Sequence, residues 1–200
     1  MSMVLSAAQV CAPGAAALPA IPAREATQAR LDRRGAVAAK YRASSPFTLG
    51  DLLEARAREH GARALLRYGE REWSYAEVNA QANRVAHAAH ALGVGRGDVV
   101  ALAMENRPEF FFAWFGLAKL GAVAAFLNTQ IGGRALAHAL AATGAQRVIV
   151  GAECLHAFAA PEVDHGGLAL WRMADAERPA GEATRGLVAL DFDARVAAAP

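Results

Sequence analysis

Three short apolar runs, separated by stretches with helical patterning, constrain this chain more than any other feature. The runs are VVALAM at 99–104, AVAAFL at 122–127 and QRVIVG at 146–151. VVALAM is continuously apolar, which is typical of a strand that is covered on both faces. The segments that join them, 106–121 and 132–144, are expected to be helices. This order of elements predicts an α/β fold with a mainly parallel sheet flanked by helices.

Two helices upstream of these runs are expected to begin at capping boxes, in which a hydroxyl side chain lies three residues before a carboxylate. The pairs are Thr48 with Asp51 and Ser74 with Glu77. Between these helices, ALLRYGEREWSY at 64–75 predicts two short strands joined at Gly69. Further along, Asn106 is expected to cap the next helix, and Pro108 suits its first turn.

The last forty residues give weaker signals. From 161 to 186 the chain is rich in glycine, proline and charge, which predicts loops. GLVALDF at 186–192 is the one candidate for a late strand. We therefore expect residues 47–200 to form one α/β unit.

Residues 1–46 are expected to form a poorly ordered basic tail. Residues 1–42 contain six basic and two acidic residues, a net charge of +4, so the remainder carries −2 of the chain's total of +2. That total is too small to indicate nucleic acid as a partner. A signal peptide is disfavoured because no basic residue precedes Arg24. A second interpretation of the tail is a basic helix that touches anionic lipid.

The apolar stretch at 110–127 is a poor membrane span. Its 18 residues fall just short of the roughly 20 that a spanning helix needs, and Lys119 near its middle costs roughly 2.5–3.5 kcal/mol at the bilayer centre. A soluble helix, turn and strand explains the same residues without that cost. The nearby glycine motifs GVGRGD and GGRAL are predicted to be turns. The first precedes a strand, whereas a dinucleotide loop follows one, and the second lacks the Lys-Ser/Thr of a P-loop.

Thiols and imidazoles do not form a recognisable site. The two cysteines, Cys11 and Cys154, have no partner at a metal-binding or disulfide spacing, so free thiols in a reducing cytoplasm are expected. His87 and His90 lie three residues apart on one predicted helix, but no third ligand has a fixed spacing to them.

Three carboxylates, Asp98, Glu105 and Glu109, lie near predicted strand ends, where α/β proteins hold ligands. Roles in turns and helix starts explain them equally well. The sequence therefore assigns no catalytic, cofactor-binding or metal-binding residue.

Two segments, in order, carry a family resemblance. WSYAEVN at 73–79 and LAKLGAVAAFLN at 117–128 resemble the first two core motifs of the AMP-forming acyl-activating, or adenylate-forming, superfamily. The stretch from 106 to 129, followed by GRALAHAL, is closer to its long- and very-long-chain fatty acid–CoA ligases of the fatty-acid transport protein type, whose strand also ends in Leu-Asn-Thr. The resemblance covers roughly residues 47–150 and implies that residues 47–200 are an incomplete N-terminal α/β subdomain of an AMP-binding domain. One departure is Gly132, where a basic residue is expected.

The resemblance implies a two-step reaction that uses ATP, Mg²⁺ and CoA. A fatty carboxylate attacks the α-phosphate of ATP to give an acyl-adenylate and pyrophosphate, and the CoA thiol then displaces AMP. In the family these steps use a Ser/Thr/Gly-rich loop ending in Pro-Lys, a later Thr-Glu, an Asp before the hinge and a C-terminal lysine. None of these motifs occurs in the 200 residues, and neither Lys40 nor Lys119 has the matching context.

The motifs that match are therefore expected to be scaffold. Trp73, Tyr75 and Glu77 would fix a strand–helix junction, and Leu127, Asn128 and Thr129 would end a buried strand.

The resulting expectation is the N-terminal portion of a long-chain fatty acid–CoA ligase that is inactive alone. The alternative is a non-enzymatic fragment of the same fold that binds a fatty acid or a partner. The full-length enzyme is expected to act on a fatty acid and to lie in the cytoplasm. Peripheral contact of the enzyme with the inner membrane is left open. Acyl chain length and oligomeric state are not determined by the sequence.

Overall fold

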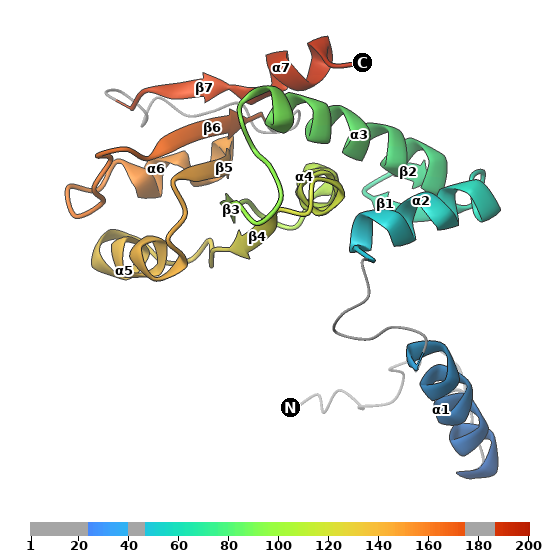
Figure 1. The fold of residues 1–200 in the computed structure, drawn as a ribbon. Coiled ribbons are helices and arrows are strands. Elements are labelled where there is room, and N and C mark those ends of the chain that lie inside the picture. Colours follow the sequence, from blue (N-terminus) through green and yellow to red (C-terminus); the bar gives the residue numbers. More distant parts are fainter. Residues whose placement is uncertain (1–23, 40–46, 175–186) are drawn as a thin grey trace, which may run out of the picture. The chain divides into compact units, whose positions relative to one another are not determined.

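The computed structural model describes residues 24–39, 47–174 and 187–200, and the chain divides into two units, Met1–Ser45 and Pro46–Pro200. In the first unit, α1 (Arg24–Ala38) is a helix without a buried residue. The rest of the predicted tail, residues 1–23 and 40–46, lies outside the described residues. All the other elements belong to the second unit (Figure 1).

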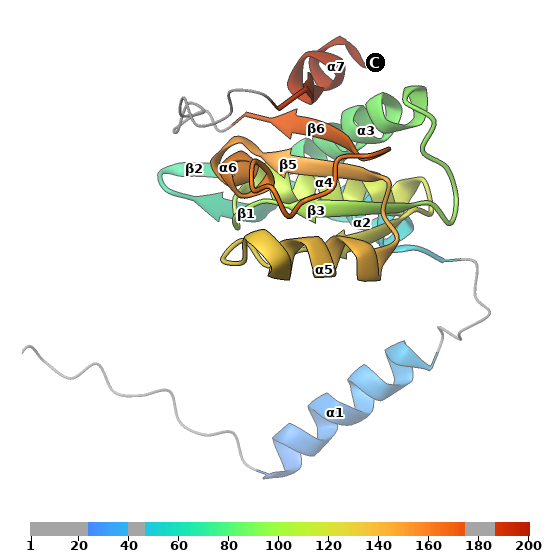
Figure 2. The ribbon, with the colours of Figure 1, turned by 90° about the vertical axis from the view of Figure 1, so that its left-hand side faces the viewer.

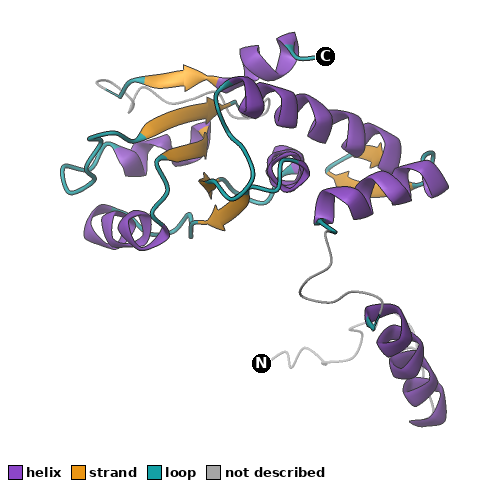
Figure 3. Ribbon diagram, viewed as in Figure 1, coloured by secondary structure: helices purple, strands orange, loops and turns teal. Residues whose placement is uncertain are grey.

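Strands and helices alternate through the second unit (Figure 3). In chain order they are α2 (Leu49–His60), β1 (Ala64–Tyr68), β2 (Arg71–Ser74), α3 (Tyr75–Ala91), β3 (Val99–Ala103), α4 (Pro108–Lys119), β4 (Val123–Phe126), α5 (Gly133–Thr143), β5 (Arg147–Gly151), the 3₁₀ turn η1 (Ala152–Cys154), α6 (Leu155–Phe158), β6 (Ala169–Met173), β7 (Ala189–Asp191) and α7 (Phe192–Ala198). The three apolar runs are thus β3, β4 and β5, as predicted.

Five strands form one parallel sheet in the order β4-β3-β5-β6-β7. β3 lies inside this sheet, with Ala101 opposite Ala125 of β4 on one side and Val148 of β5 on the other. The hairpin of β1 and β2 is antiparallel and separate. The predicted α/β class, with a parallel sheet between helices, is therefore confirmed.

Helices cover both faces of the sheet (Figure 2). On one face, α3, α4 and α7 pack on alternate strand residues such as Val100, Leu102 and Ile149. On the other face, α5 and α6 pack on the intervening residues such as Val148 and Val150. Because successive side chains of a strand point to opposite faces, a continuously apolar run supplies both cores.

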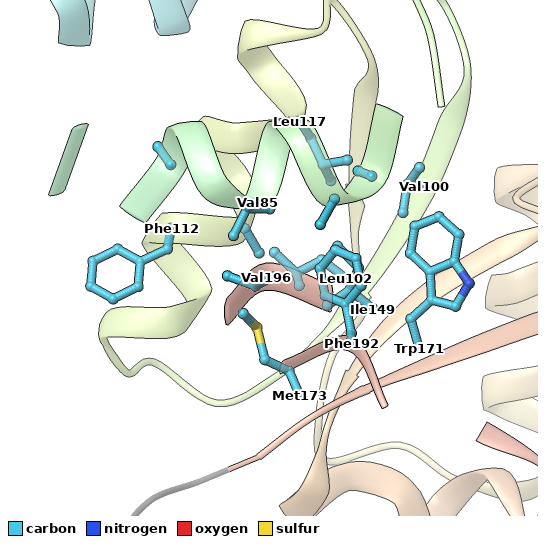
Figure 4. Close-up of a cluster of buried hydrophobic side chains, with 14 of the residues drawn as sticks. Val85, Val100, Leu102, Phe112, Leu117, Ile149, Trp171, Met173, Phe192 and Val196 are labelled. Atoms are coloured by element: carbon cyan, nitrogen blue, oxygen red, sulfur yellow. The ribbon is translucent and has the colours of Figure 1, made fainter. Parts of the chain in front are cut away.

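The core beneath α3, α4 and α7 joins the middle of the chain to its C-terminal segment (Figure 4). Trp171 of β6 stacks on Phe192 of α7, with ring centroids 5.3 Å apart and planes 18° apart. Gly116 lets α4 approach α3, since a Cβ atom there would lie 2.7 Å from Cγ1 of Val85. The close approach of the two helices explains a glycine in the middle of α4.

Both predicted capping boxes are present. Ser74 Oγ accepts the backbone N–H of Glu77, and the Glu77 carboxylate accepts the N–H of Ser74 at 2.7 Å. The same reciprocal pair forms between Thr48 and Asp51. In each pair the hydrogen bonds hold the pKa of the carboxyl below its usual value.

Three sequence expectations were wrong or incomplete. The N-cap of α4 is Arg107 rather than Asn106, because Pro108 occupies the first helical position. The predicted loop region contains β6, whose apolar pattern is broken by Arg172. The last residues, where no element was expected, form α7, which Asp191 caps by accepting the N–H of Ala194.

Candidate functional site

The order of strands reverses between β3 and β5, which locates the candidate site. The chain passes from β3 to β4 on one side, then returns to place β5 on the other side of β3. After these strands, α4 and α6 leave toward opposite faces of the sheet. In open α/β sheets, ligands bind in the crevice that such a reversal leaves at the carboxyl ends of the strands. The loops after β3 and β5 lie at this position.

Arg107, in the loop after β3, fills this position and is 3% exposed. Its guanidinium donates to the main-chain oxygens of Met173 at 3.0 Å and Ala174 at 2.7 Å, at the end of β6. It also donates to the carboxylate of Glu109 at 3.0 Å. One side chain thereby joins the carboxyl ends of β3 and β6 across the end of β5.

Glu153, in the turn after β5, completes the cluster. Its side chain is 7% exposed, and Oε1 lies 3.5 Å from Arg107 Nε and accepts the Glu105 N–H at 3.0 Å. Oε2 is buried without a hydrogen-bond partner among the described residues. The carboxylate lies so close over Gly151 that a Cβ atom there would come within 2.2 Å of Oε1. The crevice is therefore occupied by the chain's own ion pair.

An open hollow of about 570 Å³ lies beside this ion pair. Its lining comes from Glu105, the 129–133 loop after β4, and η1 with α6. The carboxylates of Glu105 and Glu153, the thiol of Cys154 and the imidazole of His156 are its ionisable groups, and His156 Nδ1 is 2.9 Å from the main-chain oxygen of Glu153. Because the lining has two carboxylates and neither Lys nor Arg, its side chains suit a hydrogen-bond donor.

Cys154 also borders the hollow but is not a nucleophile at neutral pH. Burial raises the pKa of its thiol to about 12, and the nearby carboxylates of Glu153 and Glu105 contribute in the same direction. The thiolate is the reactive form of cysteine, so this thiol stays protonated and inert. The other cysteine, Cys11, lies outside the described residues.

The three carboxylates singled out in the sequence are not brought together. Glu105 borders the hollow at the carboxyl end of β3, and Glu109 pairs with Arg107 at the start of α4. Asp98 lies at the opposite end of β3, where it accepts the Gly95 N–H at 3.0 Å and lies 3.8 Å from Arg147. Asp98 therefore has the turn role that was the alternative interpretation.

Lys119 is held in a structural ion pair. Its ammonium is 2.5 Å from Oε1 of Glu54, and a Cβ atom at Gly50 would come within 2.7 Å of its side chain. The lysine thus fixes α2 against α4. The other lysine, Lys40, lies outside the described residues.

The histidine pair is on the exposed side of α3, where His90 Nδ1 lies 3.3 Å from the Val94 main-chain oxygen. Across residues 24–39, 47–174 and 187–200, no three His, Cys, Asp or Glu side chains gather as a metal site would require. No helix in these ranges is both long and apolar enough to cross a membrane.

The residues of the motifs that resemble the family make structural contacts within the second unit. Trp73 meets Phe112 edge-on with centroids 6.4 Å apart, and the Tyr75 N–H donates to the Arg63 main-chain oxygen. At the end of β4, the Leu127 N–H donates to Leu102, and Asn128 Oδ1 accepts an N–H of the following turn. Thr129 lines the hollow.

Arg107 and Glu153, which build the site, were not singled out by the sequence. They are 46 positions apart. Arg107 lies within the 106–129 stretch that carries the family resemblance but was given no role there, and Glu153 belongs to no recognised motif. The one local signal is the Gly-x-Glu of 151–153 directly after a strand, which becomes meaningful only when the order of strands is known.

Most of the second unit matches a known protein family. The profile of the AMP-binding enzymes matches residues 53–196. Among curated proteins, a medium/long-chain-fatty-acid–CoA ligase of Mycobacterium tuberculosis is 34% identical over 64% of this chain and 21% of its own length. Long-chain fatty acid transport protein 6 of Mus musculus is 38% identical over 54% of this chain and 18% of its own length. The chain thus spans about a fifth of these relatives.

Solved structures of related enzymes match the same part of the chain. The anthranilate CoA ligase AuaEII, in complex with anthranoyl-AMP, superposes with a TM-score of 0.64 at 27% identity, over 77% of this chain and 28% of that one. The N-terminal domain of FACL13 from Mycobacterium tuberculosis superposes with a TM-score of 0.61 at 29% identity, over 77% of this chain and 37% of that domain.

Proposed function

Since this chain belongs to the AMP-binding enzyme family, we propose that it is the N-terminal portion of an ATP-dependent long-chain fatty acid–CoA ligase. The observation that carries the proposal is the similarity to a fatty-acid–CoA ligase and a long-chain fatty acid transport protein. The reaction would couple a fatty carboxylate to AMP with release of pyrophosphate, and then transfer the acyl group to the CoA thiol with release of AMP. Mg²⁺ would balance the phosphate charge.

Within that enzyme, residues 1–200 are proposed to be scaffold. Arg107 and Glu153 occupy the crevice at the strand reversal, and Lys119 is committed to Glu54. No catalytic step is assigned to the residues beside the crevice. The groups that bind ATP, Mg²⁺ and CoA would then be contributed by polypeptide other than residues 1–200.

Two enzyme assays test the two parts of this proposal. The 200-residue chain, incubated with ATP, Mg²⁺ and palmitate, is expected to give no exchange of labelled pyrophosphate into ATP above a no-protein control. Exchange by this chain alone would overturn the scaffold role. A polypeptide that contains residues 1–200 together with the missing motifs should form acyl-CoA from palmitate, and failure across C8–C18 fatty acids would overturn the long-chain ligase.

A non-enzymatic binding fragment is the second candidate. The observation that favours it is a band of half-exposed aromatic rings on α4 and the edge strand β4, namely Phe110, Phe111, Trp114, Phe115 and Phe126. A monodisperse chain with one cooperative melting transition, which binds a fluorescent fatty acid, would support this candidate. Aggregation through the open edge of β4 would argue against it.

The place of action is proposed to be the cytoplasm. A ligase that uses fatty acids meets its substrate at a lipid surface, so peripheral contact with the inner membrane is part of the proposal. Partition of the complete enzyme between the cytosolic and the salt-washed membrane fraction measures this contact.

A further inference from the structure

The charges of α1 are separated onto two faces of the helix. At 3.6 residues per turn, Arg30, Arg33, Arg34 and Val37 fall on one side, and together they line one shallow surface. The acidic residues lie on the other side. There the Asp32 carboxylate accepts a hydrogen bond from the Gln28 amide at 2.8 Å, and Glu25 is two turns earlier on the same face.

This helix has no internal reason to be stable alone. Its 15 residues are at the length where isolated helices are marginal in water, and none of them is buried. Its last turn carries no basic residue to interact with the helix dipole. A helix of this kind gains stability when one face is bound.

The basic face fits an anionic lipid surface better than other anionic partners. Leu31 and Val37 are 53% and 52% exposed, so aliphatic side chains are available beside the guanidinium groups. Arginine can lay its aliphatic stem along an apolar layer while its charged end reaches phosphates. No aromatic residue of α1 is available to stack on nucleic acid bases.

We propose that the face of α1 formed by Arg30, Arg33, Arg34 and Val37 binds the surface of membranes that contain anionic phospholipid. Binding is mainly electrostatic and therefore weakens with ionic strength. It concerns a unit distinct from Pro46–Pro200 and does not depend on the ligase proposal.

Vesicle binding by the whole 200-residue chain tests the proposal. Vesicles of phosphatidylcholine with 30 mol% phosphatidylglycerol are compared with pure phosphatidylcholine at 0.1 M NaCl. Each arginine near an anionic surface contributes about 1 kcal/mol, so R30Q/R33Q/R34Q should lower the partition coefficient roughly a hundredfold. Glutamine is a good helix former, so the helix itself is retained.

The matched control R58Q/R84Q/R134Q removes the same net charge from three exposed positions on α2, α3 and α5. It should change the partition coefficient less than about threefold, because these charges are dispersed. Equal losses for both triple variants, or no preference for anionic vesicles by the unsubstituted chain, would overturn the proposal. Tighter binding to a 20-nucleotide RNA than to anionic vesicles would also overturn it. The melting temperature of each variant shows that the second unit remains folded.

Discussion

The two ends of α4 each have a nearly buried cation, and these cations differ in their partners. Arg107 lies at the N-terminal end of the helix, and Lys119 lies in its last turn. Arg107 bonds two main-chain oxygens and lies against Glu153, which is itself 7% exposed. Lys119 pairs with Glu54, which is 43% exposed. Removing Arg107 would leave a carboxylate buried without its counter-charge, whereas removing Lys119 leaves one that water can reach. The ion pairs at the two ends of α4 are therefore expected to contribute differently to the free energy of unfolding.

The largest effect is expected at the N-terminal end. Arg107→Ala should lower the free energy of unfolding by about 3–5 kcal/mol, because it leaves Glu153 buried and two main-chain oxygens without donors. Urea unfolding followed by tryptophan fluorescence measures this loss.

A double-mutant cycle with Glu153→Gln sharpens the result. The double variant should lose less stability than the sum of the two single variants, since glutamine removes the uncompensated charge. Additive losses would show that the two side chains do not act as a pair.

The middle of α4 ranks next. Gly116→Ala should cost about 1–3 kcal/mol despite the better helix propensity of alanine, because the new methyl group would meet Val85 and the main-chain oxygen of Ala82. Thermal unfolding measures the change. In a Val85→Ala background the penalty should shrink, and an unchanged penalty would place its origin elsewhere. Gly35→Ala in α1 is the matched control, since nothing lies within 4 Å of its added Cβ.

A smaller effect is expected at the C-terminal end. Lys119→Met should change the free energy of unfolding by no more than about 1 kcal/mol, because the thioether fills much of the same space and Glu54 turns to solvent. The same urea experiment applies. A loss as large as that of Arg107→Ala would remove the distinction between the two ends.

The smallest effect on stability is expected at the start of α3, and it should depend on pH. The start of α4 has no side-chain cap, whereas α3 starts with the reciprocal pair of Ser74 and Glu77. Hydrogen bonds hold the pKa of Glu77 below its ordinary value of 4.5. A lowered folded-state pKa gives stability that is present above the unfolded value and is lost as pH falls through the folded value.

Ser74→Ala should therefore cost about 1 kcal/mol at pH 7 and less at a pH below the folded-state pKa of Glu77, where the carboxylate is protonated in both proteins. Urea midpoints at the two pH values measure the difference. An equal cost at both pH values would show that the carboxylate does not contribute to the cap.

Much of the fold follows from local patterns. The capping residues Ser74 and Glu77 define where α3 begins, and the apolar runs define β3, β4 and β5, because these signals act within a few residues. β6 escaped prediction since Arg172 breaks its pattern, and that arginine is explained only by Asp191 of the neighbouring strand, 2.9 Å away. A strand whose apolar pattern is interrupted in this way is recognised only when the neighbouring strand is known.

By itself, the sequence determined the class of fold and the order of the elements from α2 to β5, because both depend on residue spacing along the chain, and the likeness of its motifs to known ones indicated the family. Only the tertiary structure decided which charges meet. Arg107 and Glu153 are 46 positions apart, and Arg107 reaches the main-chain oxygen of Met173 across 66. These distances are closed by the reversal of strand order around β3, which depends on the packing of helices over both faces of the sheet rather than on any local motif.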